Sequence, residues 1–324
     1  MSRGCAIAWS SSANLGPGFD VMALAHTAYY DLACVEVEKG SGEVRASLHG
    51  PFSAHVSRPT TAEVAVRRAL ELLGDDVGAT ITLWKGIPVS AGLGGSAASA
   101  VAALRALEQA LDEPIPTGLL VRLAGEAEVV SAGSPHFDNA AASAVGGLVL
   151  VSRAGGDVVV RSLRPKARFV VLRPLVAPVP MKTKVMREAL PRAVELERHV
   201  EDMSRALMLA LALAEGDLEL AGRMMEDSIV TPARAPHVPC FEAVRGALLK
   251  AGAYGVAISG AGPSLIALGP QDSLEELAKA GLAAYESCGL PAEAKVVEPS
   301  RGSEPVSPDE ASRLARRREE VIFG

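Results

Sequence analysis

The chain has 324 residues, of which 49% are hydrophobic and 22% charged, and its formal net charge at pH 7 is −6. Its apolar runs are broken well short of the ~18 residues that a membrane span needs, and its acidic balance argues against nucleic acid or an anionic membrane as a partner. A chain of this length favours two domains over one. An early apolar run of only five residues is too short for a signal peptide, so we expect a cytoplasmic protein.

In the first half, apolar and β-branched residues bracketed by Gly or Ser predict strands, and capping residues predict helices. The expected strands are 5–9, 28–38, 43–49, 78–86 and 146–153, and the expected helices are 60–74, 96–111 and 117–130.

The second half favours strands at 157–163, 167–173 and 293–298, a strand pair around 259–264, and helices at 182–227, 239–251 and 272–288. Strands grouped before helices in each half indicate an α+β fold rather than an alternating one. We expect a first domain at 1–153, a second at 154–300 and a charged tail at 301–324 that carries a short solvated helix from Pro308.

Cysteine and amide side chains are scarce. Cys5, Cys34, Cys240 and Cys288 show neither CxxC nor Cys/His spacing, so a zinc site or redox motif is not indicated, and we expect buried free thiols. The chain has only two Asn and two Gln, which resembles the composition of thermophile proteins. The position of each Asn is therefore informative.

The stretch "GIPVSAGLGGSAAS" at 86–99 places glycines directly before a helix expected from Ser96. Glycines let the backbone approach a ligand, and the first N–H groups of a helix attract anions, so this loop predicts an anion site. A plain turn before an Ala-rich helix is the alternative. The loop lacks the Lys of a Walker motif. It fits the Rossmann spacing formally, but no strand brings Asp112 beside a ribose.

Three motifs occur in order: "SSANLGPGFD" at 11–20, the glycine-rich loop at 86–99 and "GVAISGAGPSLIAL" at 255–268. Together they resemble the family of galactokinase, homoserine kinase, mevalonate kinase and phosphomevalonate kinase. The first motif and "SPHFDN" at 134–139 are most similar to its homoserine kinase branch. The resemblance implies phosphorylation of an amino-acid alcohol, homoserine, with ATP and Mg²⁺, by a homodimer.

The resemblance also implies the two-domain GHMP kinase fold. In that fold the N-terminal domain is like domain 2 of ribosomal protein S5, has a left-handed βαβ crossover and binds the nucleotide. The C-terminal domain is ferredoxin-like and closes over the substrate.

The family assigns ATP binding to the glycine-rich loop and to the turn of the third motif. By resemblance the nucleotide-binding residues are Pro88, Val89, Ser90, Ala91, Gly92, Leu93, Gly94, Gly95, Ser96, Ala97, Gly260 and Gly262. Because Mg²⁺ prefers hard oxygen ligands and keeps several waters, the implied pair of Ser96 and Glu128 suffices to hold it. Glu126 is the competing carboxylate, and a solvated helix position is the alternative role for Glu128.

Homoserine carries an ammonium, a carboxylate and a hydroxyl, and the resemblance supplies a partner for each. Asp20 is expected to pair with the ammonium. Arg187 and Arg234 are expected to bind the carboxylate through their planar donors, with His136 as a further donor. A solvated surface charge is the alternative for either Arg.

The hydroxyl is expected to lie between Asn14 and Asn139, since an amide both donates and accepts without ionising. The turn of residues 16–18 would bring Asn14 and Asp20 to one ligand. With Asn139 where mevalonate-type relatives have Asp, we expect catalysis by Asn14, Asn139 and Glu128 without a general base. Asp138, placed in the same substrate site, is the carboxylate that contests this interpretation.

Two further interpretations stay open. A related kinase of a mevalonate-like or shikimate-like alcohol would not need an ammonium partner at Asp20. A sensor on the same fold that has lost phosphoryl transfer would not need the metal pair of Ser96 and Glu128.

Overall fold

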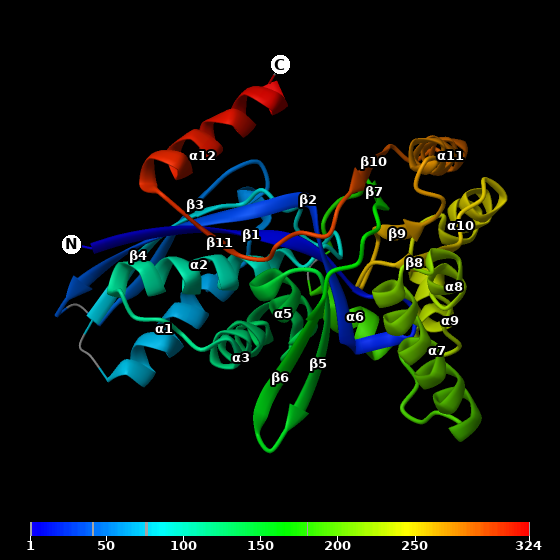
Figure 1. Ribbon diagram of the computed structural model, residues 1–324. Coiled ribbons are helices and arrows are strands. Elements are labelled where there is room, and N and C mark those ends of the chain that lie inside the picture. The colour runs from blue at the N-terminus through cyan, green and yellow to red at the C-terminus, as the bar shows by residue number, and fades with distance from the viewer. Residues whose placement is uncertain (1, 41, 75–76, 180, 324) are drawn as a thin grey trace.

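Two sheets, each covered by helices, divide the chain into the two bodies seen on the left and right of Figure 1. The computed structural model describes residues 2–40, 42–74, 77–179 and 181–323. The two-domain α+β architecture expected from the motifs is confirmed.

The first sheet has seven strands among the described residues. They are β1 (Ser2–Asn14), β2 (Gly18–Lys39), β3 (Val44–His49), β4 (Val77–Trp84), β5 (Leu148–Ala154), β6 (Asp157–Leu163) and β11 (Glu304–Val306). The order is β11-β1-β2-β4-β3, with β5 pairing to β2 and β6 to β5. β3 and β4 pair in parallel around helix α1 (Thr61–Leu73), which makes a βαβ crossover, and the other pairs are antiparallel.

Alternation along β1 sends its side chains to two different layers. Ala6 and Ala8 belong to the main core, whereas Cys5 and Ile7 face the opposite layer. The main core is covered by α1, α2 (Gly95–Leu111), α3 (Thr117–Ala127) and α5 (Asp138–Val145). Small residues let α2 approach closely, since a Cβ on Gly4 would lie 2.2 Å from the carbonyl oxygen of Ala106.

The opposite face of this sheet is covered by α12 (Pro308–Phe323), drawn red at the top of Figure 1. Ala311 of α12 is buried there beside Cys5, Leu32 and Val306. The helix expected from Pro308 therefore exists, but part of it packs on the sheet instead of standing in solvent.

The expectation of free thiols is wrong, because Cys5 is bonded to Cys34 and Cys240 to Cys288. Antiparallel register places Cys5 directly opposite Cys34. The second disulfide joins the residue before α10 (Phe241–Lys250) to the residue after α11 (Leu274–Ser287). These pairs lie 29 and 48 residues apart in sequence, so cysteine spacing alone does not reveal them.

The second sheet contains β7 (Phe169–Pro174), β8 (Gly255–Ile258), β9 (Leu265–Leu268) and β10 (Ala292–Val297). Its order, β10-β7-β9-β8, is that of a β-α-β-β-α-β ferredoxin-like unit, as expected. Helices α10 and α11 pack on one face through Phe241, Leu248 and Tyr285. On the other face, α7 (Leu196–Glu215) and α8 (Leu218–Arg223) join the main core through Leu213 and Ala221.

Several elements differ in extent from the sequence expectation. The single helix expected at 182–227 is interrupted, and its main pieces are α6 (Lys182–Glu188), α7 and α8. β1 and β2 are longer than expected because they include the first motif, whose residues 15–17 form the tip of their hairpin.

Because β6 pairs with β5 and β11 with β1, we propose to draw the domain boundary after Leu163 and to assign 304–323 to the first domain.

Candidate active site

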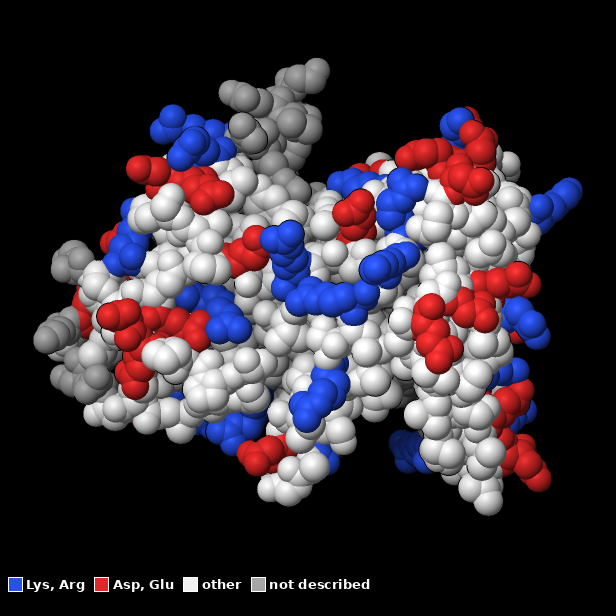
Figure 2. Space-filling model, viewed as in Figure 1, with Lys and Arg blue, Asp and Glu red and all other residues white. Residues whose placement is uncertain are grey.

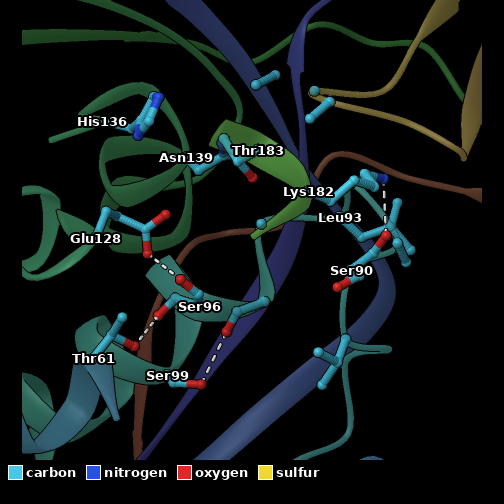
Figure 3. Close-up of a pocket in the computed structure, with 18 of the residues that line it drawn as sticks. Thr61, Ser90, Leu93, Ser96, Ser99, Glu128, His136, Asn139, Lys182 and Thr183 are labelled. Atoms are coloured by element: carbon cyan, nitrogen blue, oxygen red, sulfur yellow. Dashed lines mark hydrogen bonds between the residues drawn. The ribbon is translucent and has the colours of Figure 1, made fainter. Parts of the chain in front are cut away.

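A cavity of about 330 Å³ lies between the two domains. Its walls come from the β1–β2 hairpin, the start of α1, the glycine-rich loop and residues between Glu128 and Asn139. The second domain contributes Pro178, Met181, Lys182, Thr183, Arg234, Gly260 and Ala261. The three motifs of the sequence analysis therefore meet in one place. Figure 3 shows how the side chains converge from these elements.

The glycine-rich loop ends at α2, whose first turn opens onto the cavity. Gly94 caps this helix with φ +65°, and a Cβ there would lie 2.2 Å from Ser11 Oγ and 2.8 Å from Asn139 Oδ1. Gly92 has φ +76°, and a Cβ there would lie 2.4 Å from the carbonyl oxygen of Ser259 in the second domain. The loop therefore presents backbone at a helix N-terminus, which is the arrangement that binds phosphate.

A buried ion pair supports this loop from below. Lys85 Nζ contacts the carboxylate of Asp31, and it donates to Ser99 Oγ at 2.8 Å and to the carbonyl of Gly95 at 3.0 Å. The other oxygen of Asp31 accepts the backbone N–H groups of residues 86 and 87, each at 3.0 Å. The side chains of Lys85 and Asp31 are 4% and 0% exposed, so removing either would leave a buried charge unpaired. No local sequence pattern indicates this pair, because its members lie 54 residues apart.

Ser96 and Glu128, the expected metal ligands, are hydrogen-bonded to each other (Figure 3). Thr61 of α1 fixes the same turn by donating to the carbonyl of Ser96 at 2.7 Å. Burial raises the pKa of Glu128 to about 7, although the hydrogen bond from Ser96 acts in the opposite direction. Glu126, the competing carboxylate, is exposed and lies outside the cavity. Within the described ranges, no cluster of three or more His, Cys, Asp or Glu side chains could hold a metal.

A cluster of charged residues lies on one side of the cavity. Arg187 Nη2 donates to Asp20 Oδ2 at 2.6 Å and to His136 Nε2 at 2.8 Å. Arg234 donates to the carbonyl of Gly260 at 2.9 Å. The guanidinium carbons of Arg187 and Arg234 lie 5.3 and 5.1 Å from the centre of the Phe19 ring, which holds the two cations side by side.

Burial sets the ionisation of this cluster. It lowers the pKa of His136, although Asp20 acts in the opposite direction, and a neutral ring can accept the hydrogen bond from Arg187. Burial also lowers the pKa of Arg234 to about 10, which leaves this side chain charged at neutral pH. The cluster therefore combines one carboxylate, two cations and one neutral imidazole.

Both asparagines line the cavity, and each has a structural partner. Asn14 donates to the carbonyl of Gly260 at 3.2 Å and accepts the N–H of Asp20 at 3.2 Å. Its φ of +75° lies in the left-handed region, which Asn tolerates better than most residues. Asn139 Oδ1 accepts from Ser11 Oγ at 2.8 Å. The amides thus help to fix the walls of the site.

Asp138 is 2% exposed, and one of its oxygens accepts the backbone N–H of Asn139 at 2.7 Å. Burial raises the pKa of Asp138 to about 7, and the negative charge of Asp20 adds to this effect. At neutral pH this carboxyl group is therefore divided between its protonated and ionised forms.

Lys182 and Ser90 join the second domain to the glycine-rich loop, and the sequence analysis missed the role of Lys182. Lys182 Nζ donates to the carbonyl of Ser90 at 2.9 Å (Figure 3), and Ser90 Oγ donates to the carbonyl of Val179 at 3.0 Å. Burial, followed by the charge of Arg234, lowers the pKa of Lys182 to about 7. Thr183 lines the same wall.

A buried histidine stands behind the first motif. His26 is 0% exposed, and its two ring nitrogens lie 3.1 Å from Ser10 Oγ and 3.1 Å from Ser12 Oγ. Ser259 of the second domain donates to Ser12 Oγ at 2.8 Å. Burial lowers the pKa of His26 to about 3, so the ring is neutral in this network. This role of His26 could not be predicted from its sequence spacing.

The structure brings most of the expected site residues together. Asn14, Asp20, residues 88–96, Glu128, His136, Asp138, Asn139, Arg234 and Gly260 all line the cavity. Ala97, Arg187 and Gly262 are outside this lining. Arg187 contacts two lining side chains, Asp20 and His136, and a Cβ on Gly92 would lie 2.5 Å from the carbonyl oxygen of Gly262.

A helix N-terminus, a hydroxyl–carboxylate pair and a cluster of opposite charges around one cavity suit the chemistry of a small-molecule kinase. Models of the GHMP kinases N terminal domain and of the GHMP kinases C terminal domain match residues 60–147 and 209–287. The chain belongs to the GHMP kinase family.

Relatives of known sequence or structure agree with this assignment. The chain is 46% identical to the homoserine kinase of Aeropyrum pernix, with 89% of this chain and 92% of that one covered. It is 42% identical to the homoserine kinase of Pyrobaculum aerophilum, with 91% and 97% covered. The crystal structure of homoserine kinase from Cytophaga hutchinsonii matches with a TM-score of 0.85 at 31% identity, and the match covers 94% of this chain and 98% of that one.

Proposed function

We propose that this enzyme transfers the γ-phosphoryl group of ATP to the side-chain hydroxyl of L-homoserine, forming O-phospho-L-homoserine for threonine biosynthesis. The observation that carries the proposal is that Asp20, His136 and Arg234 line the same cavity as the glycine-rich loop, with Arg187 hydrogen-bonded to Asp20 and His136. A cluster with one carboxylate and two cations matches a substrate that carries both an ammonium and a carboxylate group. An alcohol without an ammonium group would leave Asp20 without a partner on the ligand. The homoserine kinases at 42–46% identity support the same substrate.

In this proposal the binding of homoserine replaces the ion pair between Asp20 and Arg187 by ion pairs with the substrate. Asp20 and Arg187 pair with each other in the structure. Homoserine would present its ammonium to Asp20 and its carboxylate to Arg187 and Arg234, so that each charge keeps an opposite charge nearby. Charge-assisted hydrogen bonds of this kind fix orientation as well as affinity, because the Arg donors are planar.

We propose Ser96 and Glu128 as the magnesium ligands. Their oxygens meet at the end of the phosphate loop, and a buried carboxylate whose pKa is raised to about 7 gains from a nearby cation. Two protein oxygens are enough for an ion that keeps most of its waters. When bound, Mg²⁺ would neutralise phosphate charge during transfer. Glycine-loop N–H groups would hold the phosphates, and the pair under the loop, Lys85 and Asp31, would keep that loop in place.

Asn14 and Asn139 are proposed to keep the acceptor hydroxyl in line with the phosphoryl group. Phosphoryl transfer depends mainly on positioning and charge stabilisation, so the hydroxyl proton can leave late to a phosphate oxygen. An amide does not remove a proton at neutral pH. Asp138 is engaged by the N–H of Asn139, and its raised pKa leaves part of it protonated, so we assign it to positioning.

We also propose a homodimer that works in the cytoplasm. One face of α7 exposes apolar side chains at helical spacing: Leu196, Val200, Met203, Leu207 and Leu211. A second copy would cover this stripe by an isologous contact. In the described part of the chain no helix is long and apolar enough to cross a membrane. Two disulfides do not exclude the cytoplasm, because intracellular proteins of hyperthermophiles are rich in disulfides, and the scarcity of Asn and Gln in this chain resembles a thermophile composition.

An ADP-release assay with homoserine, mevalonate, shikimate and galactose, each with and without Mg²⁺, tests the function. We expect Mg²⁺-dependent turnover with homoserine at least ~100-fold above the other alcohols, because only homoserine uses both charges of the acceptor cluster. Preferred turnover of another alcohol would favour a different kinase of the family, and no turnover at all would favour a sensor.

A further inference from the structure

A second recess lies where the chain crosses between the domains. Residues 164–168 connect β6 of the first sheet to β7 of the second, and residues 298–303 return the chain from β10 to β11. The recess between these connections has a volume of about 790 Å³. It is lined by Arg164, Pro165, Lys166, Ala167, Arg168, Gln271, Glu298, Pro299 and Arg301, none of which lines the active-site cavity.

The lining of this recess is strongly basic in an acidic protein. It contains four cations, Arg164, Lys166, Arg168 and Arg301, against one carboxylate, Glu298. In the part of the chain that the structure describes, no ion pair involves any of the four cations. Figure 2 shows Lys and Arg side chains gathered at the centre of the face, where the domains meet. A local excess of positive charge on a chain of net charge −6 attracts small anions.

Two of the guanidinium groups are held in place by backbone. Arg164 donates to the carbonyls of Ser300 and Val145 at 3.0 and 2.9 Å. Arg168 donates to the carbonyl of Gln271 at 2.5 Å, while Gln271 Oε1 accepts the N–H of Arg168 at 2.7 Å. Carbonyl oxygens orient a guanidinium without cancelling its charge, and each group has five N–H donors. The recess is therefore organised before any ligand arrives.

We propose that this recess is a binding site for a small, multiply charged anion that bears phosphate or carboxylate groups. Fixed Arg donors match both kinds of group, and Lys166 and Arg301 supply further charge from the two opposite connections. A ligand here contacts both connections that run between the domains, 164–168 and 298–303, so its binding restrains the relative motion of the domains that enclose the active site. The site is independent of the nucleotide and acceptor chemistry proposed above.

Calorimetry with inorganic pyrophosphate as the probe tests the proposal. A metal chelator is present throughout, and no nucleotide is added, because a nucleotide is itself a multiply charged phosphate and would compete for the recess. We expect a saturable pyrophosphate component of one site per chain in the native enzyme that is weakened at least ~10-fold in the double variant Lys166→Gln/Arg301→Gln, whereas any binding at the active site is the same in both proteins. Binding is also expected to weaken as salt rises, since it depends on charge. Tricarballylate in a parallel titration distinguishes a preference for phosphate from a preference for carboxylate.

The matched control is Arg67→Gln/Lys250→Gln, which removes the same charge from exposed positions outside both cavities. It should bind pyrophosphate like the native enzyme. The proposal is overturned if neither anion binds saturably, or if the control weakens binding as much as the recess variant does. An oligonucleotide that bound the recess more tightly than pyrophosphate would overturn the assignment to a small ligand.

Discussion

Arg187, near the end of α6 in the second domain, reaches across the cavity to Asp20 of the β1–β2 hairpin, with 2.6 Å between Nη2 and Oδ2. Their side chains are 34% and 38% exposed, so solvent and a small substrate can both reach the pair. The proposed binding of homoserine replaces one salt bridge inside the protein by two with the ligand. If homoserine binds as proposed, its binding is coupled to the contact between the domains at these two residues.

Asp20→Asn tests this exchange. The variant keeps the size and most hydrogen bonds of the side chain but loses the charge that faces the ammonium. We expect the KM for homoserine to rise about 10–100-fold, which corresponds to about 1.4–2.8 kcal/mol, with the KM for ATP unchanged. Steady-state kinetics in both substrates measures this. Asp157→Asn, at an exposed position in the β5–β6 hairpin, is the control. An unchanged KM for homoserine would remove Asp20 from the acceptor site.

Glu128→Gln tests the metal pair. Glutamine can still accept the hydrogen bond from Ser96, but it lacks the charge that attracts Mg²⁺. We expect kcat to fall at least ~100-fold and the Mg²⁺ concentration for half-maximal rate to rise, because a charge-stabilising group is lost. The matched control is Glu126→Gln, two residues away and exposed. An unaltered Mg²⁺ dependence in the Glu128 variant would contradict the assignment.

Asp138→Asn tests the proposal that no general base operates. Because the carboxylate is assigned to positioning Asn139, its replacement by an amide should lower kcat by less than about 100-fold. Rates measured from pH 6 to 9 should also keep the shape of the native profile. A loss of about 1000-fold or more with homoserine binding intact would instead identify Asp138 as the base.

Leu207→Glu tests the proposed dimer. Leu207 is 67% exposed in the middle of the α7 stripe, and a charge there would be buried in an isologous contact. We expect the variant to be a monomer by light scattering while retaining its secondary structure. Leu72→Glu, a residue on α1 that is 60% exposed, should leave the dimer intact. A native enzyme that is already monomeric would refute the proposal.

The buried His26 should make the folded protein less stable at acid pH. The pKa of His26 is lowered from 6.5 to about 3 in the folded protein. Between pH 6.5 and 3 the unfolded chain therefore binds a proton at this residue and the folded chain does not. The free energy of unfolding should therefore fall as the pH drops from 6.5 towards 3, by about 3 kcal/mol at pH 4 from this residue alone. Denaturant titrations of native enzyme and His26→Gln should show a flatter limb in the variant. Identical limbs would mean that His26 does not carry the effect.

Local sequence was sufficient to predict features that depend on one continuous motif. The glycine-rich loop predicted a turn followed by a helix start, and both line the cavity; phosphate binding there stays a prediction. Local sequence patterns could not predict the register in which distant strands pair. Cys5 meets Cys34 only because β1 and β2 pair in one register.

The interactions that sequence reasoning missed are those between distant segments. Lys85 and Asp31 are separated by 54 residues, and each looks like an ordinary polar residue at its place in a strand pattern. Lys182 meets Ser90 from a different domain, 92 residues away. Only the packing of the two sheets shows that these side chains share one site.

Gly92 has a consequence for how the enzyme can change over evolution. Its α-carbon sits against the backbone of the β8–β9 turn, where a Cβ would lie 2.4 Å from one carbonyl oxygen and 2.5 Å from the next. One added methyl group at Gly92 would force the first domain and the second domain apart at this contact. The two domains can therefore change in sequence independently elsewhere. At this contact, a change at Gly92 requires a matching change in the β8–β9 turn.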